Sequence, residues 1–362
     1  MSSTSQLSFE RKLLFIFIGI ASSLFLVIAG GEIVMRINNV PIGPPYNGKE
    51  KDKILGWKTK PYYRYYTKEF SDNKNGKYEV NLNFTKHGFR LWNEKAHDST
   101  QGNVFVVGDS YVESIEVSDD KTFYSVFKDS CPVKVSAYGT AGYGFTQEYL
   151  IMNQFIDSLN PKWIVLLTCS NDYVDNYWKM EEKSWYTAGQ TRPYLNLQSK
   201  IEYHFPRPWY ERAKDYSLFL DFIFRRIRQG LINAEIILPD GVPDHAIERQ
   251  DKNYDDFEMT CILSENVLKK MKLLAESHQA KLLVYILGDL NNTINKMDAI
   301  VAACKLNNIA IITGAEELTL IHEKKGETIH SFDNYHFNNN GQKILGQVLI
   351  DYFRKNELAD KP

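Results

Sequence analysis

Five short apolar runs constrain the fold of this chain more than any other feature. They span residues 103–108, 133–137, 163–168, 281–287 and 309–312. Continuous apolar runs of this length, separated by stretches with helical spacing, are typical of parallel strands covered by helices on both faces. The clearest helical stripe follows the last run and consists of Ile344, Leu345, Val348, Leu349, Tyr352 and Phe353. We therefore predict a three-layer α/β/α domain over residues 103–356, built on a parallel five-stranded sheet in flavodoxin-like order.

A second constraint is an uncharged apolar run near the amino terminus, at residues 13–31. A helix of this length can cross a bilayer core of about 30 Å. Arg11 and Lys12 precede the run, which favours a cytoplasmic amino terminus and an exported body. A cleaved signal peptide is the alternative, but the run is longer than the apolar core of such peptides. We predict a cytoplasmic tail over residues 1–12, an uncleaved transmembrane anchor, and a body that is periplasmic or on the cell surface.

Three further segments differ in composition from the predicted domain core. Residues 32–60 are rich in Pro, Gly and Lys and are predicted to form a stalk. Residues 61–102 alternate aromatic and polar side chains, which predicts a strand-like leader packed on the domain. Residues 177–260 interrupt the strand–helix alternation as an aromatic-rich insertion, with a helix near residues 215–229. The following aromatic side chains could form either a sugar-binding platform or the insertion's own core: Tyr177, Trp178, Trp185, Tyr186, Tyr194, Trp209 and Tyr210.

Composition excludes some classes of function. The formal net charge of -2 gives no basic excess, so nucleic acid is not a predicted partner. The eight histidines are scattered, and the sequence contains neither HExxH nor CxxC, so no metal or cofactor site is predicted. The four cysteines could pair as disulfides in an exported protein or remain buried thiols. They are Cys131, Cys169, Cys261 and Cys304.

The first chemical motif follows the first apolar run, at Gly108, Asp109 and Ser110. A serine between a buried strand and a helix presents its hydroxyl at the edge of the sheet, near the backbone N–H groups of the helix start. Such a hydroxyl needs an adjacent base before it becomes a useful nucleophile. The alternative is an ordinary strand–turn–helix serine that caps the helix.

Two motifs that could stabilise an oxyanion follow the second and third runs. The glycine-rich segment 139–144 allows backbone N–H groups to approach a ligand closely, and its spacing does not match a dinucleotide-binding fingerprint. Asn171 follows the third run, where its amide could face a developing negative charge. A flexible turn and an Asx turn are the respective alternatives.

The fourth motif pairs an acid with a histidine. Asp333 stands three residues before His336, just ahead of a helix predicted from about Asn340. A carboxylate in the same loop can orient an imidazole so that the ring accepts a proton from a serine. Taken alone, the same residues could be a capping and turn cluster.

Together, these four motifs resemble the SGNH (GDSL-type) hydrolase family. The matching segments are GDSYVES (108–114), AYGTAGYG (137–144), CSND (169–172) and DNYH (333–336), and the resemblance covers residues 103–353. The upstream ILGW (54–57) and HGFR (87–90) are also similar to the leader of many exported members. Three positions depart from the usual pattern, since the family more often has Asn, Gly and Gly at Ala137, Ser114 and Cys169.

The resemblance implies a role for each matching residue. Ser110 would be the nucleophile, His336 the general base and then general acid, and Asp333 the residue that orients the imidazole. The backbone N–H groups of Ser110 and Gly142, with the side chain of Asn171, would form the oxyanion hole.

The predicted function is serine-dependent hydrolysis of an ester outside the cytoplasm, with an O-acyl (acetyl) group of a surface glycan as the expected substrate. The predicted partners are this ester substrate and the membrane. Two alternatives remain open at the level of sequence. The same serine could pass its acyl group to a glycan as an O-acyltransferase, or the chain could be a catalytically idle binding or scaffold protein.

Overall fold

The computed structural model describes nine stretches of the chain and divides it into two compact units. The described residues are 9–38, 48–72, 76–91, 102–183, 191–205, 217–233, 254–288, 296–331 and 333–358. One unit consists of Met1–Asn47 and Arg207–Pro239, and the other of Gly48–Pro206 and Asp240–Pro362.

Helix α1 (Phe9–Ile37) dominates the first unit. It contains the whole apolar run 13–31, extends beyond it at both ends, and is long and apolar enough to cross a membrane by length and composition. Helix α7 (Leu218–Asn233) packs against it and confirms the helix expected near residues 215–229. Glu32 of α1 joins the two helices, because its carboxylate accepts hydrogen bonds from Ser217 Oγ at 2.8 Å and Phe219 N at 3.1 Å.

A parallel five-stranded sheet forms the centre of the second unit. Its strands are β5 (Asn103–Gly108), β6 (Lys134–Gly139), β7 (Trp163–Thr168), β10 (Lys281–Ile286) and β11 (Ala310–Ile312). They lie in the order β11-β10-β7-β5-β6, and every adjacent pair is parallel. This is the predicted flavodoxin-like order, in which the second strand of the sheet lies at one edge and the first lies beside it.

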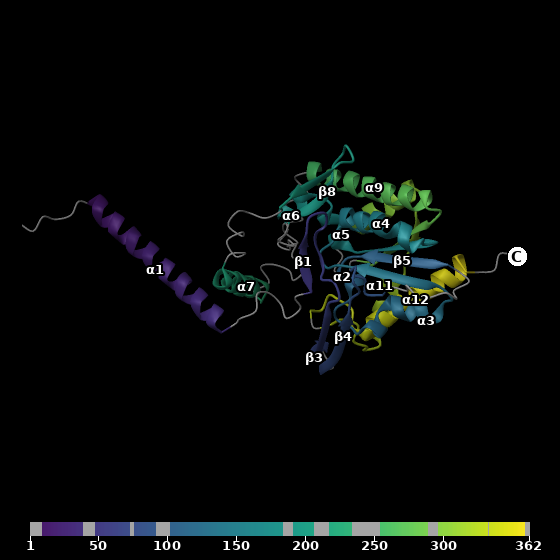
Figure 1. Ribbon diagram of the computed structural model, residues 1–362, viewed down its shortest axis with the longest axis horizontal. Coiled ribbons are helices and arrows are strands. Elements are labelled where there is room, and N and C mark those ends of the chain that lie inside the picture. Colours follow the sequence, from purple (N-terminus) through teal and green to yellow (C-terminus); the bar gives the residue numbers. More distant parts are fainter. Residues whose placement is uncertain are drawn as a thin grey trace, which may run out of the picture. The chain divides into compact units, whose positions relative to one another are not determined.

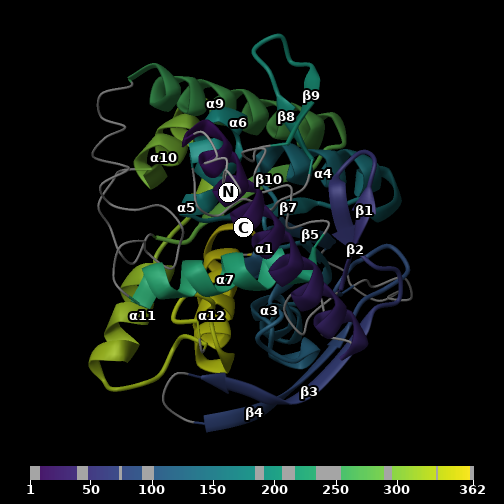
Figure 2. The ribbon, with the colours of Figure 1, turned by 90° about the vertical axis from the view of Figure 1, so that its left-hand side faces the viewer.

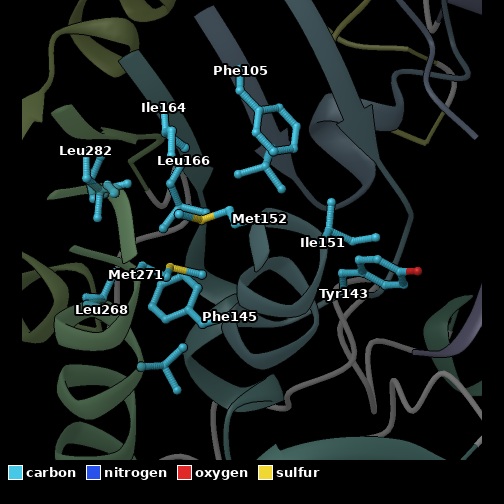
Figure 3. Close-up of a cluster of buried hydrophobic side chains, with 14 of the residues drawn as sticks. Phe105, Tyr143, Phe145, Ile151, Met152, Ile164, Leu166, Leu268, Met271 and Leu282 are labelled. Carbon is cyan, nitrogen blue, oxygen red and sulfur yellow. The ribbon is translucent and has the colours of Figure 1, made fainter. Parts of the chain in front are cut away.

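Helices cover both faces of this sheet and confirm the three-layer α/β/α architecture (Figure 1). One face carries α4 (Phe145–Leu159), α9 (Tyr254–Ser277) and α10 (Lys296–Leu306), and the other carries α3 (Phe123–Ser130) and α12 (Asn339–Asn356). Figure 3 shows Phe145 and Met152 of α4 in one buried cluster with Met271 of α9 and the strand residues Ile164 and Leu166. Shorter elements are α2 (Ser110–Glu113), η1 (Asp119–Lys121), α5 (Ser170–Asp175), α6 (Trp178–Lys183) and α11 (Ala315–Lys324).

Two antiparallel hairpins precede the sheet. The first pairs β1 (Lys49–Asp52) with β2 (Gly56–Thr59), and the second pairs β3 (Arg64–Asp72) with β4 (Gly76–Asn83). In Figure 2 the two strands of each hairpin lie side by side. The prediction of a stalk over residues 32–60 is wrong for residues 32–38 and 48–60, the parts of this segment that the structure describes. Its start continues α1, and its end is the β1–β2 hairpin, because Leu55 and Trp57 are apolar and bury themselves in the core.

The insertion forms a hairpin of β8 (Arg192–Leu195) and β9 (Ile201–His204) beside α6. Tyr194 is buried there, and its hydroxyl donates a hydrogen bond to Glu181. It therefore belongs to the insertion's own core and not to a sugar-binding platform, because a ring without exposed surface cannot stack on a sugar. The ring of Trp178 stacks on His204 with centroids 4.7 Å apart. Four of the aromatic candidates lie outside the described residues: Trp185, Tyr186, Trp209 and Tyr210.

Candidate active site

Ser110 occupies the turn between β5 and α2. Asp109 caps the short helix by accepting a hydrogen bond from Tyr111 N at 3.0 Å, so that Ser110 becomes its first residue. The helix passes very close to β6, since a Cβ placed on Gly139 would lie 2.2 Å from Glu113 N. A glycine at position 139 is thus required to bring the serine turn down onto the sheet.

His336 and Asp333 come to this serine from the loop that precedes α12. His336 Nε2 lies 2.9 Å from Ser110 Oγ, and His336 Nδ1 lies 2.5 Å from Asp333 Oδ2. The other carboxylate oxygen of Asp333 accepts hydrogen bonds from the backbone N–H groups of Tyr335 and His336, both at 3.0 Å. The loop closes through Asn334, whose φ of 59° lies in the left-handed region that asparagine tolerates. These contacts fix the direction in which the imidazole points.

Asn171 and Gly142 follow the carboxyl ends of β7 and β6, the strands on either side of β5. Asn171 Nδ2 donates a hydrogen bond to Asp109 Oδ2 at 3.1 Å, and its Oδ1 accepts one from Cys169 Sγ. The same side chain also hydrogen-bonds the carboxylate of Asp175, one turn further along α5. Gly142 has a φ of 78°, a conformation that favours glycine.

Three residues that sequence reasoning missed hold the backbone on the two sides of Ala141. The carbonyl oxygen of Ala141 accepts hydrogen bonds from Lys49 Nζ at 2.9 Å and Trp57 Nε1 at 3.2 Å. Ala141 N donates to Glu113 Oε2 at 2.7 Å. Because a trans peptide is planar, fixing the Ala141 carbonyl directs the Gly142 N–H the opposite way. The ILGW segment contains Trp57 and was the only signal in the sequence that could have indicated this contact.

Glu116 is a further missed residue. Its Oε1 lies 3.5 Å from His336 Nδ1, and its side chain is only 5% exposed. Nothing local in the sequence marks this glutamate, because its approach to His336 depends on the packing of loops that are far apart in the chain.

The acidic surroundings change the proton affinity of the imidazole. Burial alone would lower the pKa of His336, but the charges of Glu116 and Asp333 raise it to about 9. Burial would raise the pKa of Asp333, yet hydrogen bonds from His336 hold it below its usual value. Burial raises the pKa of Glu116 to about 7 against the opposing charge of His336.

The same side chains account for the groups of possible metal ligands among the described residues. Asp109, Cys169 and Asp172 have ligand-type atoms within 4.8 Å of one another, as do Glu116, Asp333 and His336. Both groups belong to the network around the serine and histidine. All four cysteines lie in the described part of the chain and are free thiols.

The sequence matches no family model and no curated protein. Several solved structures are similar to the chain in fold. A G-D-S-L lipolytic protein from Veillonella parvula has 11% identity and a TM-score of 0.40, and the match covers 70% of this chain and 98% of that one. A lipase/acylhydrolase from Enterococcus faecalis has 12% identity and a TM-score of 0.38, with coverage of 70% and 95%.

A catalytic mutant of an acetylxylan esterase from Geobacillus stearothermophilus has 8% identity and a TM-score of 0.38, with coverage of 71% and 95%. These distant similarities concern the arrangement of the backbone and carry no information about the reaction. The sheet order, the four motifs at one edge of the sheet and the serine–histidine–aspartate geometry are features of this chain itself. On these features, the chain has the fold of the SGNH hydrolases, the family that its sequence motifs resemble.

Proposed function

We propose that this protein is a serine esterase that hydrolyses O-acyl esters, with acetyl groups on a glycan outside the cytoplasm as its substrate. The observation that carries the proposal is the distance of 2.9 Å between His336 Nε2 and Ser110 Oγ, with Asp333 on the opposite ring nitrogen. This arrangement activates a hydroxyl as a nucleophile.

In the first half of the proposed reaction, Ser110 Oγ attacks the ester carbonyl carbon while His336 Nε2 takes the hydroxyl proton. A new C–O bond forms, and the carbonyl electron pair moves onto oxygen. The Ser110 and Gly142 N–H groups and the side-chain amide of Asn171 are the proposed donors to this oxyanion. Asp333 stabilises the imidazolium and does not itself take the proton.

Collapse of the intermediate breaks the bond to the alcohol, which leaves with the proton from His336. Water then gives a proton to His336 Nε2 and attacks the acyl-serine. The second collapse releases the carboxylic acid and returns the proton to Ser110. The cycle consumes one ester and one water, and it yields one alcohol and one acid.

The proposed location follows from the first unit of the chain. Helix α1 has the length and composition of a membrane span, and Arg11 and Lys12 lie at its amino-terminal end. Positive charge before a first span favours a cytoplasmic amino terminus. The body that carries Ser110 would then face polymers outside the cytoplasm, among which acylated glycans are the expected ester substrates.

A fluorophosphonate probe tests the proposed chemistry. The purified full chain in detergent should be labelled and should cleave a chromogenic acetyl ester. Ser110→Ala should abolish labelling and lower kcat by a factor on the order of 10⁶, as for the nucleophile of other serine hydrolases. Ser158→Ala is the matched control, because its exposed hydroxyl donates a local hydrogen bond to the carbonyl of Phe155 within α4. Turnover by Ser110→Ala at the wild-type rate would exclude the proposal.

A second measurement separates hydrolysis from acyl transfer. The protein is incubated with an activated acetyl ester, with and without candidate glycans, while acetate and acetylated glycan are followed together. Acetate release at an unchanged rate supports an esterase. Acetyl-glycan as the main product would replace the esterase by an O-acyltransferase that uses the same serine.

A further inference from the structure

The loop after the serine helix is held by one buried arginine. Arg90, from the HGFR segment, donates hydrogen bonds from Nη1 to the carbonyls of Glu113 and Ser114 at 2.6 and 2.8 Å. Its Nη2 donates to the carbonyl of Val117 at 2.7 Å, and its Nε pairs with Asp119. One guanidinium therefore fixes the backbone on both sides of Glu116.

The adjacent contacts remove the remaining freedom of this loop. Ser114 adopts a left-handed φ of 48°, and its hydroxyl donates to Tyr111 O and accepts from Gln342 Nε2 at 3.1 Å. The carbonyl of Glu116 itself accepts a hydrogen bond from the hydroxyl of Tyr78, on β4, at 2.9 Å. The Glu116 side chain is thus presented from a backbone anchored at several points.

The Glu116 side chain points towards the imidazole of His336. Glu116 Oε1 is 3.5 Å from His336 Nδ1, while Asp333 Oδ2 already occupies that nitrogen at 2.5 Å. At 3.5 Å a hydrogen bond is weak, so Glu116 attracts His336 mainly through its charge, and this attraction is strengthened by the burial of the carboxylate. Burying a carboxyl is costly unless a positive charge faces it, and a protonated His336 is such a charge.

We propose that Glu116 is a positioning residue of the reaction: held in place by Arg90, it is a second acidic partner of His336 and stabilises the imidazolium that forms when Ser110 loses its proton. This inference rests on the proposed esterase function and adds a fourth member to its proton-transfer network. It also gives the leader a role in the chemistry, because Arg90 lies upstream of the first strand of the sheet.

Other titratable groups face the same imidazole. Each of them also affects the pKa of His336. All of them are present in every Glu116 variant, so a difference in pKa between these variants reports on Glu116. These groups are Asp109, Asp333, His330, Tyr111 and Tyr335, while Glu113 faces the Glu116 carboxyl.

The direct test measures the imidazole itself. Full-length protein labelled with ¹⁵N in its histidine rings is titrated by NMR in detergent, and the His336 resonance is identified by its absence in His336→Gln. Glu116→Gln keeps the shape of the side chain and removes its charge. It should lower the pKa of His336 by roughly 1–3 pH units, the effect of losing one close opposite charge.

Two further variants keep the test decisive. Glu116→Asp retains the charge but withdraws it by one methylene, so the pKa of His336 should fall by less than in Glu116→Gln. Asp120→Asn removes an exposed carboxylate from the same segment and should leave the pKa unchanged. If Glu116→Gln does not fold, a pKa in Glu116→Asp equal to that of wild type overturns the proposal.

Kinetics provide the second readout. In Glu116→Gln the acid limb of kcat/KM should move to lower pH by the same amount as the NMR titration, and the plateau should fall because the base is weaker. A purely structural role would lower the plateau without moving the limb, and this result would overturn the inference while leaving the esterase intact. A shifted NMR pKa in a protein without turnover would instead count against the proposed function alone.

Discussion

Lys49 Nζ donates a hydrogen bond of 2.9 Å to the carbonyl oxygen of Ala141, across 92 residues of sequence. The same lysine lies 3.7 Å from Glu113 Oε2, whose carboxylate holds Ala141 N. The first hairpin of the body therefore fixes the plane of the peptide that carries the Gly142 N–H. We expect this peptide to require such fixation, because oxyanion donors act by being oriented before the reaction begins.

Replacing Lys49 tests this support. Lys49→Met should lower kcat by roughly 10-fold with little change in KM, because a small misplacement of a catalytic group can cost up to about 10²-fold. Trp57 still holds the carbonyl, so the loss should be partial. Lys58→Met, a lysine of the same hairpin that pairs with Asp52 at 3.0 Å, is the matched control and should retain wild-type kcat. Equal kcat in both variants would remove Lys49 from the network.

Asn171 should contribute mainly to the transition state. Asn171→Ala should lower kcat by about 10²–10³-fold, which corresponds to about 2.7–4 kcal/mol, while KM changes little. Steady-state kinetics on an acetyl ester measure both constants. Asn356→Ala, near the end of α12, removes an exposed amide and should have no effect. A rise in KM at constant kcat would indicate a role in substrate binding instead.

The pH dependence should follow His336. Only the neutral imidazole can accept the serine proton, and the pKa of His336 is raised to about 9. The value of kcat/KM should therefore increase as the pH rises towards about 9 and level off above it. Rate measurements from pH 6 to pH 10 with a non-ionising ester follow this limb. A plateau already reached near pH 7 would mean that the acidic partners do not act on the imidazole as their positions suggest.

Arg192 should stabilise the insertion. It is 1% exposed and forms ion pairs with Asp175 at 3.3 Å and Glu181 at 2.9 Å. Arg192→Met leaves two buried carboxyls without their cation, so the free energy of unfolding should fall by about 3–5 kcal/mol. Lys200→Met, on the exposed turn of the same hairpin, is the control in chemical denaturation. A loss below about 1 kcal/mol, typical of a surface pair, would contradict the buried role.

The proposed location of the body outside the cytoplasm can be tested with fusions. A reporter that is active only in the cytoplasm, fused after Pro362, should be silent, because Arg11 and Lys12 favour a cytoplasmic amino terminus. A periplasmic reporter at the same position should be active. The reverse pattern would invert the topology and would also remove the reason to expect a surface glycan as substrate.

The sequence by itself determined the α/β/α fold and pointed to the serine, histidine and aspartate that the structure brings together. The apolar runs at 103–108 and 163–168 coincide with β5 and β7, because strands buried on both faces must be apolar throughout. Asp333 and His336 share one loop, so their pairing is a local property that spacing can reveal. Ser110 could be placed at the same edge because parallel strands end together.

Only the tertiary structure decided which distant side chains support that site. Glu116 reaches His336, and Lys49 reaches Ala141, through the packing of segments that sequence patterns treat as separate. The segment expected to be a stalk includes a hairpin, because Trp57 is buried against the domain. Tyr194 lies in a core, where Glu181 accepts the hydrogen bond of its hydroxyl. Local propensity carries no information about such partners, since hydrogen bonds and burial between remote residues exist only once the chain has folded.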